Sequence, residues 1–83
     1  MSEPVQNILV VEDNPTIGKG LVKALEHERF EVRHVESAED GVVALQARAP
    51  DLVICDIMLP GQDGLSLMRQ IKSDYPGIPV IML

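Results

Sequence analysis

Four short apolar runs divide the chain into regular segments. They cover residues 7–11, 30–35, 52–55 and 80–83, and the first and third are almost continuously apolar and rich in branched side chains. Runs of this kind are typical of strands that are covered on both faces in a parallel sheet. The second run is less apolar, and we expect it nearer an edge of the sheet.

Helices are predicted between these runs, because apolar residues there recur every three or four positions. Asn14 followed by Pro15 indicates the start of the first helix, with a cap residue and then proline at the first helical position. Ser37, with Asp40 three residues later, resembles a capping box at the start of the second helix. Pro50 sets a limit on how far that helix extends.

A third helix is marked by Leu65, Met68 and Ile71, and it is expected to end before Tyr75. Strands and helices therefore alternate along the whole chain, with short connections. Because crossovers between parallel strands are right-handed, this order predicts an α/β fold with a parallel sheet. In such a sheet, ligands bind beyond the carboxyl ends of the strands, near the point where the strand order reverses.

Composition and charge narrow the class of protein. The 83 residues suffice for one domain, 46% of them are apolar, and the net charge is −6. An acidic chain without lysine or arginine clusters is not expected to bind nucleic acid directly. No apolar stretch approaches the roughly 20 residues that cross a bilayer, and no secretion signal is recognisable, so we expect a cytoplasmic protein that does not enter the membrane.

Three carboxylates follow the first and third apolar runs. Glu12 and Asp13 come after the first, and Asp56 comes after the third. Parallel strands end at the same edge of a sheet, so these acids should lie together, and their mutual repulsion needs a cation or a proton to offset it. Mg²⁺ prefers oxygen ligands, and no histidine or cysteine cluster suggests zinc. A carboxylate can also attack phosphorus, and Asp56 is the candidate nucleophile.

Two motifs resemble those of the two-component response-regulator receiver family. They are ILVVEDN, at residues 8–14, and DIMLPGQDG, at residues 56–64. The resemblance extends from about residue 7 to residue 83 in the order and spacing of the elements. It implies a flavodoxin-like, doubly wound parallel sheet with strand order 2-1-3-4. On this reading residues 1–6 form a flexible N-terminus, and residues 7–83 form a partial receiver domain.

The same resemblance implies a role for each residue of the site. Asp56 would be phosphorylated by a histidine kinase or a phosphotransfer protein, and Asp13 and Asp56 would bind Mg²⁺ directly. The backbone carbonyl of Met58 would be a third ligand, and Glu12 would act through water. Two further residues would shape the loop after Asp56. Pro60 would restrict φ, and Gly64 would permit a turn into the third helix.

The chain also departs from the family pattern. A complete receiver continues past the fourth strand with a serine or threonine, a fifth strand that ends in lysine, and two more helices. Without them we expect the fourth strand to be an unpaired edge, through which the chain could self-associate. The module is expected to control a transcriptional output domain that lies outside this segment. The alternative is an inert fragment that acts only as a structural or self-associating module.

An enzymatic alternative is a Mg²⁺-dependent phosphohydrolase, which would need a second aspartate two residues after the nucleophile. Met58 occupies that position, so no enzyme is expected. Cys55 is interpreted as a core side chain, because it has no partner cysteine. His27 and His34 are each isolated, and we expect both on the surface.

Overall fold

A computed structural model describes residues 6–59 and 63–83. In this part of the chain, four parallel strands form one sheet in the order β2-β1-β3-β4, as predicted. The strands are β1 (Asn7–Val11), β2 (Glu31–Val35), β3 (Leu52–Cys55) and β4 (Val80–Met82). The helices are α1 (Pro15–His27), α2 (Ala38–Ala47) and α3 (Gly64–Asp74).

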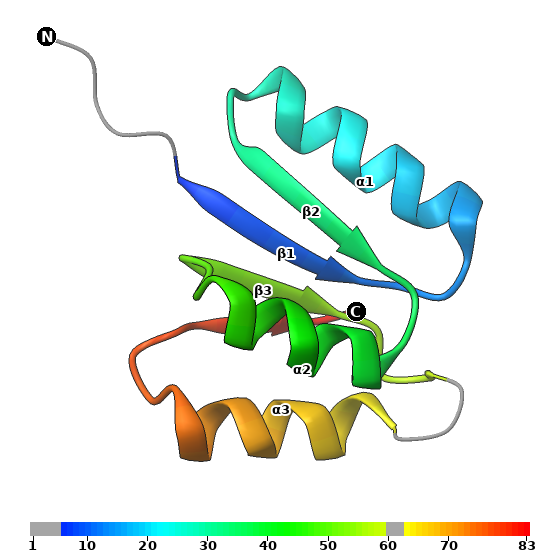
Figure 1. The fold of residues 1–83 in the computed structure, drawn as a ribbon. Coiled ribbons are helices and arrows are strands. Elements are labelled where there is room, and N and C mark those ends of the chain that lie inside the picture. Colours follow the sequence, from blue (N-terminus) through cyan, green and yellow to red (C-terminus); the bar gives the residue numbers. More distant parts are fainter. Residues whose placement is uncertain (1–5, 60–62) are drawn as a thin grey trace, which may run out of the picture.

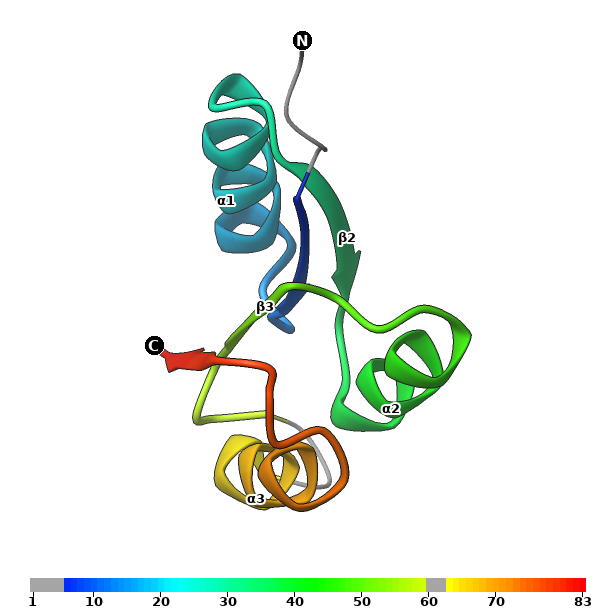
Figure 2. The ribbon, with the colours of Figure 1, turned by 90° about the vertical axis from the view of Figure 1, so that its left-hand side faces the viewer.

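The helices lie on both faces of the sheet. Figure 1 shows the order of the elements, and the view in Figure 2 shows α1 on one side of the sheet with α2 and α3 on the other. Helices on both faces of a parallel sheet define a doubly wound α/β fold. The flavodoxin-like architecture expected from the sequence is therefore confirmed.

The two predicted capping residues start their helices. The side-chain oxygen of Asn14 accepts hydrogen bonds from the N–H groups of Thr16 at 2.9 Å and Ile17 at 3.2 Å. Pro15 follows as the first residue of α1. The Ser37 hydroxyl accepts one from the N–H of Asp40 at 3.1 Å. These bonds satisfy backbone donors that have no partner within the helix. The second helix ends at Ala47, slightly earlier than Pro50 alone would require.

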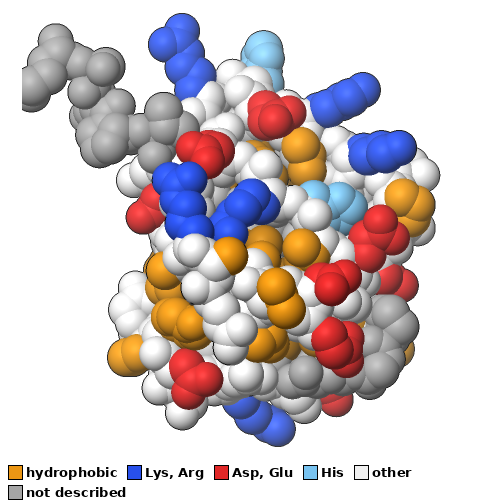
Figure 3. All heavy atoms as spheres, in the orientation of Figure 1, with side chains coloured by type: hydrophobic (Ala, Val, Ile, Leu, Met, Phe, Trp, Pro, Cys, Tyr) orange, Lys and Arg blue, Asp and Glu red, His pale blue; other side chains and the backbone are white. Residues whose placement is uncertain are grey.

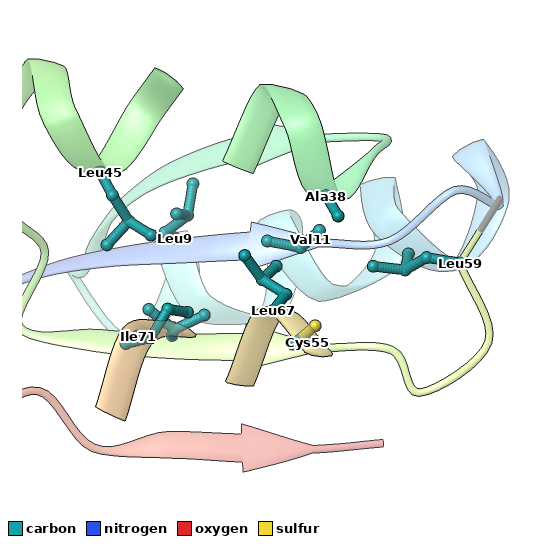
Figure 4. Packing of buried hydrophobic residues seen from close by; sticks show 9 residues of the cluster. Leu9, Val11, Ala38, Leu45, Cys55, Leu59, Leu67 and Ile71 are labelled. Carbon is teal, nitrogen blue, oxygen red and sulfur yellow. The ribbon is translucent and has the colours of Figure 1, made fainter. Parts of the chain in front are cut away.

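Apolar side chains fill the space on both faces of the sheet. Between α1 and the sheet lie Ile8, Val10 and Ile54. The larger cluster fills the other face, where side chains of β1 and β3 meet those of α2 and α3 (Figure 4). This cluster contains Leu9, Val11, Ala38, Leu45, Val53, Cys55, Leu59, Leu67 and Ile71. All five residues of β1 are buried, as expected for a central strand covered on both faces.

The two outer strands differ from β1 and β3 in their exposure. β2 is partly exposed along its length, in agreement with the edge position predicted for it. β4 pairs only with β3 among the described residues, and Ile81 and Leu83 are each 49% exposed. Self-association through β4 stays a prediction. Most of the N-terminal segment 1–6, and Pro60, lie outside the described residues.

Candidate metal centre

The parallel register brings the three predicted acids to one place. Val11 and Cys55 are opposite each other in the pairing of β1 with β3, so Glu12 and Asp56 directly follow a matched pair. The N–H of Asp56 donates to the Val11 carbonyl at 3.0 Å, which extends the pairing by one step. Each acid offers a carboxylate oxygen, and these oxygens all lie within 4.8 Å of one another. The structure thus assembles the cluster formed by Glu12, Asp13 and Asp56, called the acidic cluster below.

The three carboxylates differ in their surroundings. Glu12 is buried, with 3% of its surface exposed, and one of its oxygens accepts a hydrogen bond from the N–H of Asn14 at 3.0 Å. Asp13 is exposed. Asp56 is partly exposed, and its Oδ1 accepts a hydrogen bond from the N–H of Met58 at 3.0 Å. The local backbone therefore holds two of the carboxylates, while the cluster stays open to solvent at Asp13.

Negative charge at the cluster is not balanced by the described residues. The ion pair found among them joins Arg48 to Glu31 at 2.7 Å, near the start of β2 and away from the cluster. Burial raises the pKa of Glu12, and its neighbours Asp13 and Asp56 raise it further, while the Asn14 N–H opposes the shift. Figure 3 shows several acidic side chains on the side toward which the strand arrows of Figure 1 point. This set of oxygen donors fits a hard divalent cation such as Mg²⁺.

The described parts of the loop after Asp56 show what glycine does at the start of α3. Gly64 is buried, its N–H donates to the Ile57 carbonyl at 2.9 Å, and a Cβ at this position would overlap the Asp56 carbonyl. Gly64 lies where the chain turns from this loop into α3, the place predicted for it. Gly64 has no positive φ, and what it provides is a close approach of two backbone segments.

The cysteine and the two histidines of the chain were each given a predicted environment from the sequence. Cys55 is fully buried, and its pKa is raised to about 11 by burial and by the charges of Asp56 and Glu12. Its interpretation as a core side chain is confirmed. His27 is exposed as expected, but the surface placement expected for His34 is wrong. His34 is half-buried, and its Nε2 lies 2.8 Å from the backbone oxygen of Glu12.

The fold and the site together define a doubly wound α/β domain with an acidic cluster at the carboxyl ends of its central strands. The family model described as the response regulator receiver domain matches residues 8–83. The chain therefore belongs to the receiver domain family of two-component response regulators. Domains of this family are generally signalling modules rather than enzymes, and they typically use Mg²⁺ and interact with histidine kinases.

Individual relatives agree with this assignment. The chain is 36% identical over 78 residues to the DNA-binding response regulator MtrA of Mycolicibacterium smegmatis, covering 94% of this chain and 34% of that protein. It is 40% identical over 77 residues to the DNA-binding transcriptional regulator NtrC of Proteus hauseri, covering 93% of this chain and 16% of that protein. It thus spans about a third of the first protein and about a sixth of the second, and its likeness to them concerns one segment of each.

Solved structures show the same fold. The N-terminal domain of a response regulator receiver protein from Methanoculleus marisnigri matches with a TM-score of 0.88 and 38% identity, covering 95% of this chain and 66% of that one. The receiver domain of a signal transduction histidine kinase from Syntrophus aciditrophicus matches with a TM-score of 0.89 and 37% identity, covering 95% and 61%. Among the described helices, none has the length and apolar character needed to span a bilayer.

Proposed function

We propose that this receiver domain accepts a phosphoryl group on Asp56 from a histidine kinase or a phosphotransfer protein, with Mg²⁺ bound at the acidic cluster. The observation that carries the proposal is the approach of the three carboxylates to within 4.8 Å at the end of β1 and β3. Family membership supports it, because receiver domains typically use Mg²⁺. Residues 7–83 would then form the receiver segment.

Each residue has a distinct part in this proposal. Asp13 and Asp56 would be the direct carboxylate ligands of Mg²⁺, the Met58 backbone carbonyl would be a third ligand, and Glu12 would act through water. When bound, Mg²⁺ would neutralise oxygens of the transferring phosphoryl group. An Asp56 carboxylate oxygen forms the new bond to phosphorus as the bond from phosphorus to the donor histidine nitrogen breaks. The Met58 N–H holds Oδ1 of Asp56 and fixes the orientation of the carboxylate for that attack.

The output would be transcriptional control through another part of a longer protein. The relatives named above include DNA-binding regulators, and this chain covers only a segment of each. The net charge of −6 supports a segment that leaves DNA contacts to another domain.

The test is to incubate the protein with Mg²⁺ and acetyl phosphate and to measure its intact mass. We expect a labile phosphoryl adduct on the wild type and on Asp74→Asn, which removes an exposed acid on α3. Asp56→Asn should give no adduct, and a chelator should abolish the adduct on the wild type. An adduct that persists in Asp56→Asn would contradict the proposal. No adduct on a folded wild type that still binds Mg²⁺ would favour the inert fragment.

A further inference from the structure

His34 connects β2 directly to the backbone that carries the acidic cluster. Its Nε2 lies 2.8 Å from the Glu12 carbonyl oxygen. A carbonyl oxygen can only accept a hydrogen bond, so Nε2 must carry the proton in this contact. The next residue of β2, Val35, accepts a hydrogen bond from the N–H of Glu12 at 3.0 Å. Two consecutive residues of β2 therefore hold both backbone polar groups of Glu12.

The bond from His34 fixes the peptide group that joins Glu12 to Asp13. That peptide is planar, so holding its oxygen also fixes the direction of the Asp13 N–H. The direction of the Asp13 Cα–Cβ bond follows from this plane and from one further rotation about N–Cα, so the exposed carboxylate has only its side-chain torsions left to adjust. Glu12 has its own restraint at the Asn14 N–H, and Asp56 has one at the Met58 N–H. For Asp13, the described contacts provide no such bond to the carboxylate, and the restraint is the hydrogen bond from His34 to the preceding peptide group.

The first helix leaves room for the histidine ring. Gly18 is buried in α1, and a Cβ at that position would overlap the ring of His34. Gly20, on the same helix, has nothing within 4 Å of where its Cβ would lie. A side chain at position 18 would therefore displace the ring, and with it the donor to Glu12. The ring position is set from both sides, by α1 and by the end of β1.

We infer that His34 is a positioning residue, whose Nε2–H orients the Glu12–Asp13 peptide so that the Asp13 carboxylate is placed for binding a divalent cation. This inference rests on the proposed function, since it assigns Asp13 to the cation. It adds a residue of β2 to a site that otherwise comes from the ends of β1 and β3.

The test measures Mn²⁺ binding by the loss of the free-ion signal in electron paramagnetic resonance. His34→Met removes the donor at similar side-chain length, and His34→Gln keeps an N–H in the place of Nε2. We expect His34→Met to bind Mn²⁺ about tenfold more weakly than the wild type, as for other residues that orient metal ligands. His34→Gln should bind close to the wild type. The matched control is His27→Met, at the exposed end of α1, which should bind as the wild type does.

The outcomes separate this inference from the proposed function. If Asp13→Asn binds Mn²⁺ as the wild type does, the proposed cation site is wrong. If Asp13→Asn loses binding but His34→Met, folded by circular dichroism, binds normally, only the role of His34 is wrong. Equal weakening in His34→Met and His34→Gln would also overturn it, because lost packing alone gives that result.

Should His34→Met fail to fold, the wild type still provides a test. Long-range ¹H–¹⁵N correlation spectra of the imidazole ring distinguish its tautomers. A proton on Nε2 of His34 supports the inference. A ring protonated on Nδ1 alone would overturn it, since the hydrogen bond to Glu12 could not exist.

Discussion

Gly64 packs directly against the backbone carbonyl of Asp56. A Cβ on residue 64 would overlap that carbonyl, and the Gly64 N–H already donates to Ile57 at 2.9 Å. The first residue of α3 is thus joined, backbone to backbone, to the residue proposed to be phosphorylated. The position of Asp56 depends on the absence of a side chain eight residues further along the chain.

Replacing Gly64 with alanine should therefore damage both stability and the site. We expect Gly64→Ala to lower the free energy of unfolding by about 1–3 kcal/mol, because backbone segments have to separate to admit the methyl group. Urea unfolding followed by circular dichroism measures this. Gly20→Ala is the matched control, since its Cβ meets nothing within 4 Å. It should instead raise the free energy of unfolding by about 1 kcal/mol through helix propensity. Equal effects of the two changes would contradict this account of Gly64.

Neutralising one acid of the cluster should stabilise the metal-free protein. Asp13→Asn should raise the free energy of unfolding by about 1 kcal/mol, the interaction of two unit charges about 4 Å apart in a water-like medium. Mg²⁺ at a hundred times its dissociation constant should stabilise the wild type by about 2.7 kcal/mol and should have no such effect on Asp13→Asn. Thermal unfolding with and without Mg²⁺ measures both effects. The explanation would be wrong if Asp13→Asn were less stable than the metal-free wild type. It would also be wrong if Mg²⁺ stabilised Asp13→Asn as much as it stabilises the wild type.

Arg29 occupies a backbone conformation that favours glycine. Its φ is 70°, and it follows Glu28, the residue that caps the end of α1. The N–H of Arg29 donates to the Glu26 carbonyl at 2.9 Å, and the N–H of Phe30 donates to the Leu25 carbonyl at 3.1 Å. These two bonds form the Schellman arrangement that ends many helices. Arg29→Gly should raise the free energy of unfolding by about 1 kcal/mol by removing the cost of the left-handed conformation. Chemical denaturation would test this, and a loss of stability would show that the arginine side chain outweighs its backbone cost.

The Asp63 side chain should make the free energy of unfolding depend on pH at acidic pH. The N–H of Ser66 donates to its Oδ1 at 2.7 Å at the start of α3, and this bond lowers the pKa of Asp63 below the ordinary value of 3.8. The stabilisation is present above pH 3.8 and is lost as the pH falls through the lower value of the folded state. Asp63→Asn keeps a capping oxygen that does not ionise. The difference in unfolding free energy between wild type and Asp63→Asn should therefore shrink on acidification, whereas a constant difference would contradict the ionised cap.

Much of the fold follows from local signals in the sequence. The continuous apolar run of β1 predicts a central strand, and Asn14 and Ser37 predict the starts of their helices, because burial and capping are properties of single segments. The meeting of Glu12, Asp13 and Asp56 was also predictable. It requires only that the two strands be parallel and adjacent.

Contacts between segments far apart in the chain could not be predicted in this way. Arg33, on β2, donates to the carbonyls of Ala44 at 2.9 Å and Arg48 at 2.7 Å, at the end of α2. A single polar residue in a strand carries no signal of such partners. The same holds for His34, whose role depends on Gly18 and on the end of β1. These residues are recognised only when the distances between helix and strand are known.

The junction of β1 with β3 has a consequence for how ions and folding influence each other. Val11 and Cys55 are distant in sequence, and the acidic cluster exists only once they are paired. An unfolded chain offers scattered carboxylates with no shared geometry. An ion that binds the cluster would therefore bind only the folded protein, and it would shift the folding equilibrium toward the native state. The concentration of free cation would then influence the occupancy of the site. Because the unfolded chain is the one that proteases cleave, it would also influence the fraction of molecules that survive proteolysis.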